Sequence, residues 1–380
     1  MIFLMVVVGG ITRLTLSGLS ITEWKPVVGI LPPLSAADWA AEFAKYKEVP
    51  EYRAVHFAMT LAEFKGIYYW EYFHRLLGRL IGVAFAVPLA WFLVRRRLPQ
   101  RLVLPLASIL LLGFAQGLLG WYMVESGLAD RVEVSQYRLV AHLALALAIY
   151  SAILWVALGI VRASTGPVLR SARHGEEQHE RPMAGLDSAI HLPGSTAKGV
   201  DGRAKPGRGA IPAGQSVRAT LRPEDFARGW RRAAEVVLAL VALTILAGGF
   251  VAGTRAGLTY NTFPLMDGRL VPAGYDQLHP FYLNWFENIA AVQFDHRVLA
   301  VVTFAAVLLL WTAGLRTMLP NPARIALHLL MTAAALQVAL GISTLLLVVP
   351  VPLAAAHQAG AILVLTAAIV LRHTLRPAEI

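Results

Sequence analysis

Long apolar runs recur along this chain and constrain its fold more than any other feature of the sequence. We assign eight of them as membrane spans: 1–12 (a partial span), 72–94, 102–124, 138–161, 233–253, 294–315, 325–349 and 353–372. Most of these runs approach or exceed the roughly 20 residues that cross a bilayer as a helix. A helix satisfies its own backbone hydrogen bonds in lipid. With 57% hydrophobic and 15% charged residues, the chain is predicted to be an all-α integral membrane protein.

Charged residues fall mainly in the connections between the runs and predict their sidedness. The formal net charge is +11, which we interpret as a topology signal, so no nucleic-acid partner is expected. The basic connections carry Arg95, Arg96, Arg97 and Arg101, the segment 163–232, Arg316 and Arg324, and Arg372 and Arg376. By the positive-inside rule these connections and both termini are predicted to be cytoplasmic. The long loops 13–71 and 254–293 then face outward.

The segment 163–232 differs in kind from the rest of the chain. It is rich in Gly, Pro, Ser, Arg and Glu, and it is predicted to be a disordered cytoplasmic linker. It separates an N-terminal half (residues 1–162) from a C-terminal half (residues 233–380). His174, His179 and His191 lie in the linker without a regular ligand spacing, so we assign them to no metal site. Because the first run is only half a span, we expect the first helix to begin upstream of Met1.

The two halves carry the same marks in the same order. The matched marks are Gly9-Gly10 with Gly248-Gly249, Thr12-Arg13 with Thr254-Arg255, His74-Arg75 with His296-Arg297, Gln116 and Gly120 with Gln337 and Gly341, and His142 with His357. Four spans per half give both halves the same orientation in the membrane. The predicted fold is therefore eight transmembrane helices in two tandem four-helix bundles, related by a pseudo-two-fold axis along the membrane normal.

Four histidines lie at matched positions of these bundles. His74 and His142 are in the N-terminal half, and His296 and His357 are in the C-terminal half. Ionisable residues inside membrane helices are costly, and a single histidine of this kind could simply bond a neighbouring helix. Four in matched pairs favour two bis-histidine haems, with each pair acting as axial ligands to haem iron. Bare zinc is less consistent with the pattern, because it requires three or four close ligands. The chain has no cysteine, which excludes thiolate ligands.

The halves differ three residues before their first histidine. Glu71 precedes His74, whereas Gln293 precedes His296. A spacing of three residues places Glu71 on the face of the helix that carries His74, about one turn outward. We therefore expect chemistry at the edge of the first haem and only electron transfer at the second, although Glu71 could also be one more interfacial charge. Arg75 and Arg297 are expected either to pair with haem propionates or to extend toward lipid headgroups, and the sequence favours neither.

Several segments together resemble the haem A synthase family, in particular its cysteine-free bacterial and mitochondrial branch. These segments are GGITRLTLSGLSITEWKP, EYFHRLLGR, QGLLGWYMVESGL, RLVAHLALA, FDHRVLA and AAAHQAGAILVLT. The resemblance covers most of 1–162 and 233–373 and implies oxidation of the C8 methyl of haem O to the formyl group of haem A. It implies that His74 and His142 hold the substrate haem, that Glu71 is the catalytic carboxylate, and that His296 and His357 hold a haem b cofactor. The linker is longer than the family pattern.

The same resemblance implies the surroundings of the protein. We expect a multi-pass protein of the bacterial inner membrane with haem O as substrate, an unidentified electron acceptor, and contacts with haem O synthase and cytochrome oxidase assembly factors. The sequence leaves open whether the chain forms a homo-oligomer. Two other interpretations stay open: a di-haem b-type electron-transfer cytochrome, and a transporter that uses the histidines and Glu71 for proton coupling.

Overall fold

The computed structural model describes residues 1–24, 28–130, 134–179 and 223–377. The chain divides into two compact units, one of Met1–Leu158 with Gly229–Ile380 and one of Gly159–Arg228. The described part of the smaller unit consists of the end of α6 and the start of α7. These helical ends reach into the predicted linker, whose residues 180–222, including His191, lie outside the described residues.

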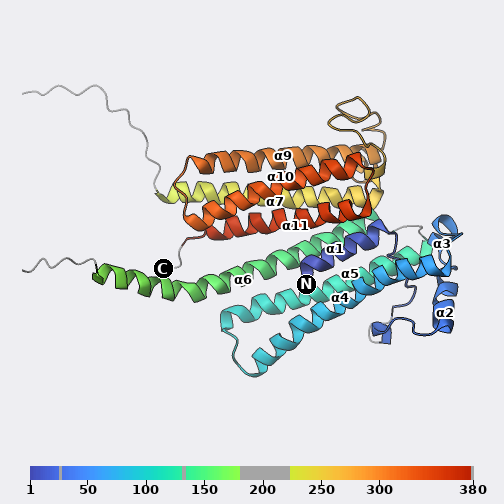
Figure 1. Cartoon of the computed structure of the whole chain (residues 1–380), viewed down its shortest axis with the longest axis horizontal. Coiled ribbons are helices and arrows are strands. Elements are labelled where there is room, and N and C mark those ends of the chain that lie inside the picture. Colours follow the sequence, from blue (N-terminus) through green and yellow to red (C-terminus); the bar gives the residue numbers. More distant parts are fainter. Residues whose placement is uncertain (25–27, 131–133, 180–222, 378–380) are drawn as a thin grey trace, which may run out of the picture. The chain divides into compact units, whose positions relative to one another are not determined.

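The larger unit is built from long apolar helices. These helices are α1 (Ile2–Leu14), α4 (Leu61–Val94), α5 (Gln100–Asp130), α6 (Gln136–His179), α7 (Pro223–Thr254), α9 (Ile289–Leu315), α10 (Asn321–Leu346) and α11 (Val351–Thr374). Within the described residues, all of them except α1 are long and apolar enough to cross a membrane, seven in total. The prediction of a multi-pass all-α membrane protein is confirmed. In Figure 1, α7, α9, α10 and α11 lie side by side.

Helix α4 begins eleven residues earlier than the second predicted span. Thr60 and Glu63 form a capping box, in which the Thr60 hydroxyl accepts from the Glu63 amide and the Glu63 carboxylate accepts from the Thr60 amide. This start signal places residues 61–71 on a helix instead of in the predicted loop. Glu71 and His74 therefore lie inside one continuous helix.

The remainder of the loop that precedes α4 also contains helices. Ser35 and Asp38 form a second capping box that starts α2 (Ala36–Tyr46), and Pro50 starts α3 (Pro50–Val55). A cluster of aromatic side chains packs α2 against the N-terminal end of α4; it is formed by Trp39, Phe43, Tyr46, Phe64, Tyr68 and Tyr72. The corresponding loop of the C-terminal half contains α8 (Asn284–Glu287) and two 3-10 turns, Ala256–Leu258 and Phe281–Leu283.

Helix α1 packs on both α4 and α11, and it therefore contacts both halves of the chain. Its Val6 belongs to the same buried core as side chains of α7, α9, α10 and α11. Near its end, Arg13 donates to the carbonyls of Ala252 (3.2 Å) and Gly253 (3.0 Å) in the last turn of α7. An arginine in this position satisfies carbonyls that a helix end leaves without partners.

The α2–α3 segment contains a histidine whose protonation is coupled to folding. The buried Tyr46 hydroxyl lies 2.7 Å from Nδ1 of His56 and 3.2 Å from the Glu51 carboxylate. Burial, reinforced by the positive charge of Arg255, lowers the pKa of His56 below its usual value. The folded segment therefore binds fewer protons than the unfolded one once the pH falls below about 6.5.

We expect the free energy of opening of α2 to fall as the pH is lowered from 7.5 to 5.5. The reason is that protonation of His56 is easier in the opened segment than in the folded one. Hydrogen exchange of the α2 amides, corrected for the intrinsic pH dependence of exchange, measures this change. His56→Gln should remove most of it. An equal pH dependence in His56→Gln would show that another group is responsible.

Candidate functional site

Helix α4 places three of the candidate site's side chains within two helical turns. Glu71, His74 and Arg75 follow one another at spacings that bring them to neighbouring positions on a helix surface. Facing them are α1 and the chain that follows it, residues 15–24. The Thr12 hydroxyl lies 3.4 Å from the Trp70 carbonyl and joins α1 to α4 at this level.

The predicted pairs of histidines are brought together in each half. The rings of His74 and His142 lie close enough to interact electrostatically, and so do those of His296 and His357. In the described part of the protein, Nδ1 of His74, His142 and His296 is buried without a hydrogen-bond partner. A buried polar nitrogen without a partner is costly. Because histidine binds haem iron through Nε2, the pairing of the rings, and not the state of Nδ1, is what points to haem.

Each of the four rings packs against a glycine of a neighbouring helix. A Cβ atom added to the glycine would lie close to Cε1 of the ring: 2.8 Å for Gly9 and His74, 3.1 Å for Gly120 and His142, 3.0 Å for Gly248 and His296, and 2.8 Å for Gly341 and His357. The contacts leave no room for a side chain at Gly9 and Gly341, and they leave little at Gly248 and Gly120. The repeated glycines in the sequence are therefore the positions that admit the imidazoles.

Two glutamines hold the helices of the second histidine in each pair. Nε2 of Gln116 donates to the carbonyl of His142 at 3.1 Å, and Nε2 of Gln337 donates to the carbonyl of His357 at 2.9 Å. Both bonds fix the backbone of a histidine to the preceding helix. In each half, the repeated Gln and Gly lie one helical turn apart and therefore contact the same histidine, His142 or His357.

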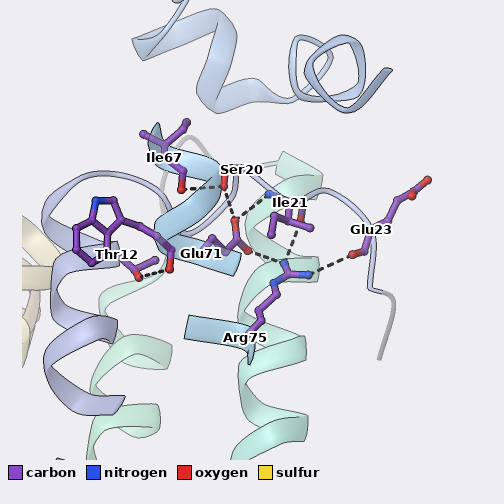
Figure 2. Close-up of polar contacts among 8 residues, drawn as sticks. Thr12, Ser20, Ile21, Glu23, Ile67, Glu71 and Arg75 are labelled. Carbon is purple, nitrogen blue, oxygen red and sulfur yellow. Dashed lines mark hydrogen bonds and ion pairs between the residues drawn. The ribbon is translucent and has the colours of Figure 1, made fainter. Parts of the chain in front are cut away.

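Glu71 is held by donors from the chain that follows α1, as Figure 2 shows. The side chain is 3% exposed. One carboxylate oxygen accepts from the Ser20 hydroxyl and from the amide of Ile21, both at 2.8 Å. The other oxygen accepts from the Arg75 guanidinium at 2.5 Å. A buried carboxylate with charge-assisted bonds of this kind is fixed in position.

Gln293, the counterpart of Glu71, makes the opposite kind of hydrogen bond to the backbone, because it donates where Glu71 accepts. Gln293 is 2% exposed, and its Nε2 donates to the carbonyl of Tyr260 at 3.1 Å. At the equivalent place in the N-terminal half, Glu71 accepts from a backbone amide. Only the N-terminal half therefore carries a buried negative charge near its histidine pair at this position.

Arg75 and Arg297 make matching contacts with the loops that follow α1 and α7. Arg75 donates to the carbonyls of Ile21 (2.9 Å) and Glu23 (3.1 Å), and it also lies over the ring of Trp24. Arg297 donates to the carbonyls of Tyr260 (2.7 Å) and Thr262 (2.9 Å). Each guanidinium thus ties a loop to the helix with the first histidine. Their contact with propionates stays a prediction.

The other histidines lie apart from these pairs. Nδ1 of His328 accepts from the Trp311 indole at 3.0 Å, and the buried His373 packs against the ring of Trp155. The side chains of His174 and His179 lie outside the described ones. Among the described residues, no group of three or more His, Cys, Asp or Glu side chains is placed to hold a metal ion. The zinc interpretation thus gains no support, whereas imidazole pairs fit the two axial positions of a haem.

The fold and the site together define a multi-pass helical membrane protein with two matched pairs of buried histidines. The family model of the cytochrome oxidase assembly proteins, COX15-CtaA, matches residues 1–189 and 211–369. The chain belongs to this family.

Relatives in the family are similar to this chain over nearly its whole length. A haem A synthase of Nitrosospira multiformis is 46% identical over 376 residues, which cover 99% of this chain and 90% of the relative. A haem A synthase of Nitrosomonas eutropha is 44% identical, covering 97% of this chain and 89% of the relative. One of Rhodospirillum centenum is 46% identical, covering 100% and 86%. The resemblance inferred from the sequence is confirmed at the level of the family.

Proposed function

We propose that this protein is a haem A synthase, an oxidoreductase that converts the C8 methyl group of haem O to the formyl group of haem A. The names of its relatives support this activity. The observation that carries the proposal for this chain is the difference between matched sites: a buried carboxylate, Glu71, beside one histidine pair and an amide, Gln293, beside the other.

His74 and His142 are proposed to bind the substrate haem. Their rings are buried and fit against Gly9 and Gly120, and a pair of imidazoles from two helices suits the two axial positions of a haem. With both axial positions filled by imidazole, the reaction takes place at the edge of the porphyrin. Glu71 is proposed to accept a proton or stabilise developing positive charge during oxidation of the methyl group.

The hydrogen bonds of Glu71 suggest how it performs this role. Ser20, Ile21 and Arg75 fix the carboxylate in place before the reaction, which lowers the cost of reorganising it. Arg75 and Arg297 retain N–H donors that are suited to haem propionates.

His296 and His357 are proposed to hold a haem b cofactor. Bound there, haem b would supply one-electron transfer, because the conversion of a methyl group and water to a formyl group releases protons and electrons, and the electrons must pass to an acceptor. The protein contributes the two imidazoles, the close packing at Gly248 and Gly341, and the Gln337 bond to the backbone of His357. The final electron acceptor, haem O synthase and oxidase assembly factors are proposed partners.

We also propose the predicted architecture of two tandem four-helix bundles with pseudo-two-fold symmetry. The domains are 1–162 for the substrate haem, 163–232 as a cytoplasmic linker and 233–380 for haem b. The matched contacts of the glycines, glutamines and arginines in the two halves support it. The protein is proposed to lie in a bacterial inner membrane with both termini in the cytoplasm.

A second candidate function is a di-haem b-type cytochrome that only transfers electrons. The observation that favours it is the close match of the four histidine environments. Expression in cells that make haem O but lack their own haem A synthase separates the two. Haem A in the extracted pigments supports the synthase. Haem O and haem B without haem A would support the cytochrome, and a colourless purified protein would support the transporter.

A further inference from the structure

The two adjacent glycines of α1 face different partners. Gly9 packs against His74 of its own half. Gly10 packs against Gln358 of α11, which directly follows His357 of the other half. A Cβ atom at Gly10 would overlap the Gln358 carboxamide, whose Nε2 would lie only 2.7 Å away. A side chain at Gly10 would therefore force the Gln358 carboxamide out of its position between α11 and α1.

Gln358 is also tied to α1 by a hydrogen bond. Its Nε2 donates to the carbonyl of the buried Val6 at 2.8 Å. In an α-helix this carbonyl is the acceptor for the amide four residues later, which is that of Gly10. The Gln358 carboxamide therefore lies against the backbone of α1 between Val6 and Gly10. The absence of a side chain at Gly10 leaves that part of the backbone accessible to it. Small residues that allow close backbone approach and side-chain hydrogen bonds are what join helices in membranes.

The second pair of glycines repeats this crossed arrangement. Gly248 packs against His296 of its own half, with 3.0 Å from an added Cβ to Cε1. Gly249 packs against α6 of the other half, with 3.1 Å to a methyl of Leu143 and 3.1 Å to one of Val140. Leu143 directly follows His142. In both halves, the first glycine meets a histidine of its own half and the second meets the neighbour of a histidine in the other half.

We infer that the second glycine of each pair positions the histidine-bearing helix of the opposite half, so that each haem site is completed by a contact from the other half. Gln358 and Leu143 are the positioning residues that transmit this contact to His357 and His142. The inference rests on the proposed function for the identity of the two haems. It makes α1, in the N-terminal half, a determinant of haem B retention in the C-terminal half.

Gly10→Ala tests this link in the full-length protein. The added methyl group either pushes α11 away or turns the Gln358 carboxamide, which then loses its bond to Val6, and both responses loosen the helix that carries His357. We expect haem B to leave the detergent-solubilised variant for excess apomyoglobin about fivefold faster than it leaves the wild type. The haem O and haem A retained by the protein, separated by chromatography, should leave at the wild-type rate.

Gly9→Ala is the matched control, one residue away on the same helix. Because its methyl group meets His74, it should speed the loss of haem O and haem A and leave haem B at the wild-type rate. Gly249→Ala should act as Gly9→Ala does, through Leu143 and His142. General unfolding of α1 would affect both haems alike, so it could not explain substitutions at two neighbouring positions that each affect a different haem.

A second substitution removes the clash and tests whether Gln358 transmits the effect. In Gly10→Ala combined with Gln358→Ala, the new methyl has space, so haem B should leave at the rate of Gln358→Ala alone, and Gly10→Ala should add nothing to that rate. Gly10→Ala should keep its full effect when it is combined with Leu143→Ala. Equal effects of Gly9→Ala and Gly10→Ala on both haems, or a full added effect of Gly10→Ala in the Gln358→Ala background, would overturn the inference. If wild-type protein contains no haem B, the proposed function fails instead.

Discussion

Glu71→Gln is expected to keep both haems bound and to abolish formation of haem A. The amide preserves the size of the side chain and can still accept from Ser20 and Ile21, but it carries no negative charge and cannot accept a proton. Removal of a proton-transferring group typically slows a reaction by about a hundredfold or more. Chromatography of pigments from cells that make haem O should show haem O accumulating on the protein without haem A.

Two further variants show whether the effect belongs to Glu71 itself. Gln293→Glu places a carboxylate at the matched position of the C-terminal half and should neither support nor block haem A formation beyond its effect on folding. Ser20→Ala removes one of the donors to Glu71 and should slow haem A formation by about tenfold or more, as expected for one hydrogen bond to a charged group. An unchanged yield of haem A in Glu71→Gln would remove this residue from the mechanism.

His296→Ala is expected to lose haem B and to retain haem O on the N-terminal half. The imidazole is one of two proposed axial ligands, and its removal also opens a space beside Gly248. Without the electron-transferring haem, haem A should fall to a trace. His74→Ala should give the reverse pattern, with haem B retained and haem O absent. Pyridine haemochrome spectra and chromatography of each purified variant measure both pigments.

His328→Ala provides the control for loss of a membrane histidine. His328 bonds to Trp311 and lies outside the two pairs, so its removal should leave both pigments at wild-type levels. Loss of haem O from His296→Ala, with haem B retained, would reverse the assignment of the halves. Equal loss of both pigments from His296→Ala and His74→Ala would mean that the sites are not separate.

The apolar runs were sufficient to predict the class of fold, because lipid solvation demands long apolar helices. They were poor guides to where a helix begins on the water side. The second span starts at Leu61 because of the capping box of Thr60 and Glu63, a local signal in a stretch that is not apolar. Helix α2 was not predicted for the same reason: its start is fixed by a capping box of Ser35 and Asp38 and not by an apolar run.

The candidate site was predictable where the repeat marked it. The histidines and the Gly and Gln positions could be matched between halves, but the sequence did not show that each glycine meets one imidazole. The partners of Glu71 were not predictable either. Ser20 and Ile21 lie about fifty positions away in the sequence and follow no pattern that links them to a helix residue. Contacts across the two halves, such as that of Gln358 with Val6, depend on tertiary packing alone.

The measurement that bears most directly on the paired histidines is the haem content of the purified full-length protein. The protein should be expressed in cells supplied with ample haem and then purified. A pyridine haemochrome assay then gives the haem concentration, which is divided by the polypeptide concentration. One low-spin haem for each histidine pair is the predicted result, with haem B and haem O or haem A in equal amounts. A protein that is folded and helical in detergent but has no Soret absorbance would contradict the account.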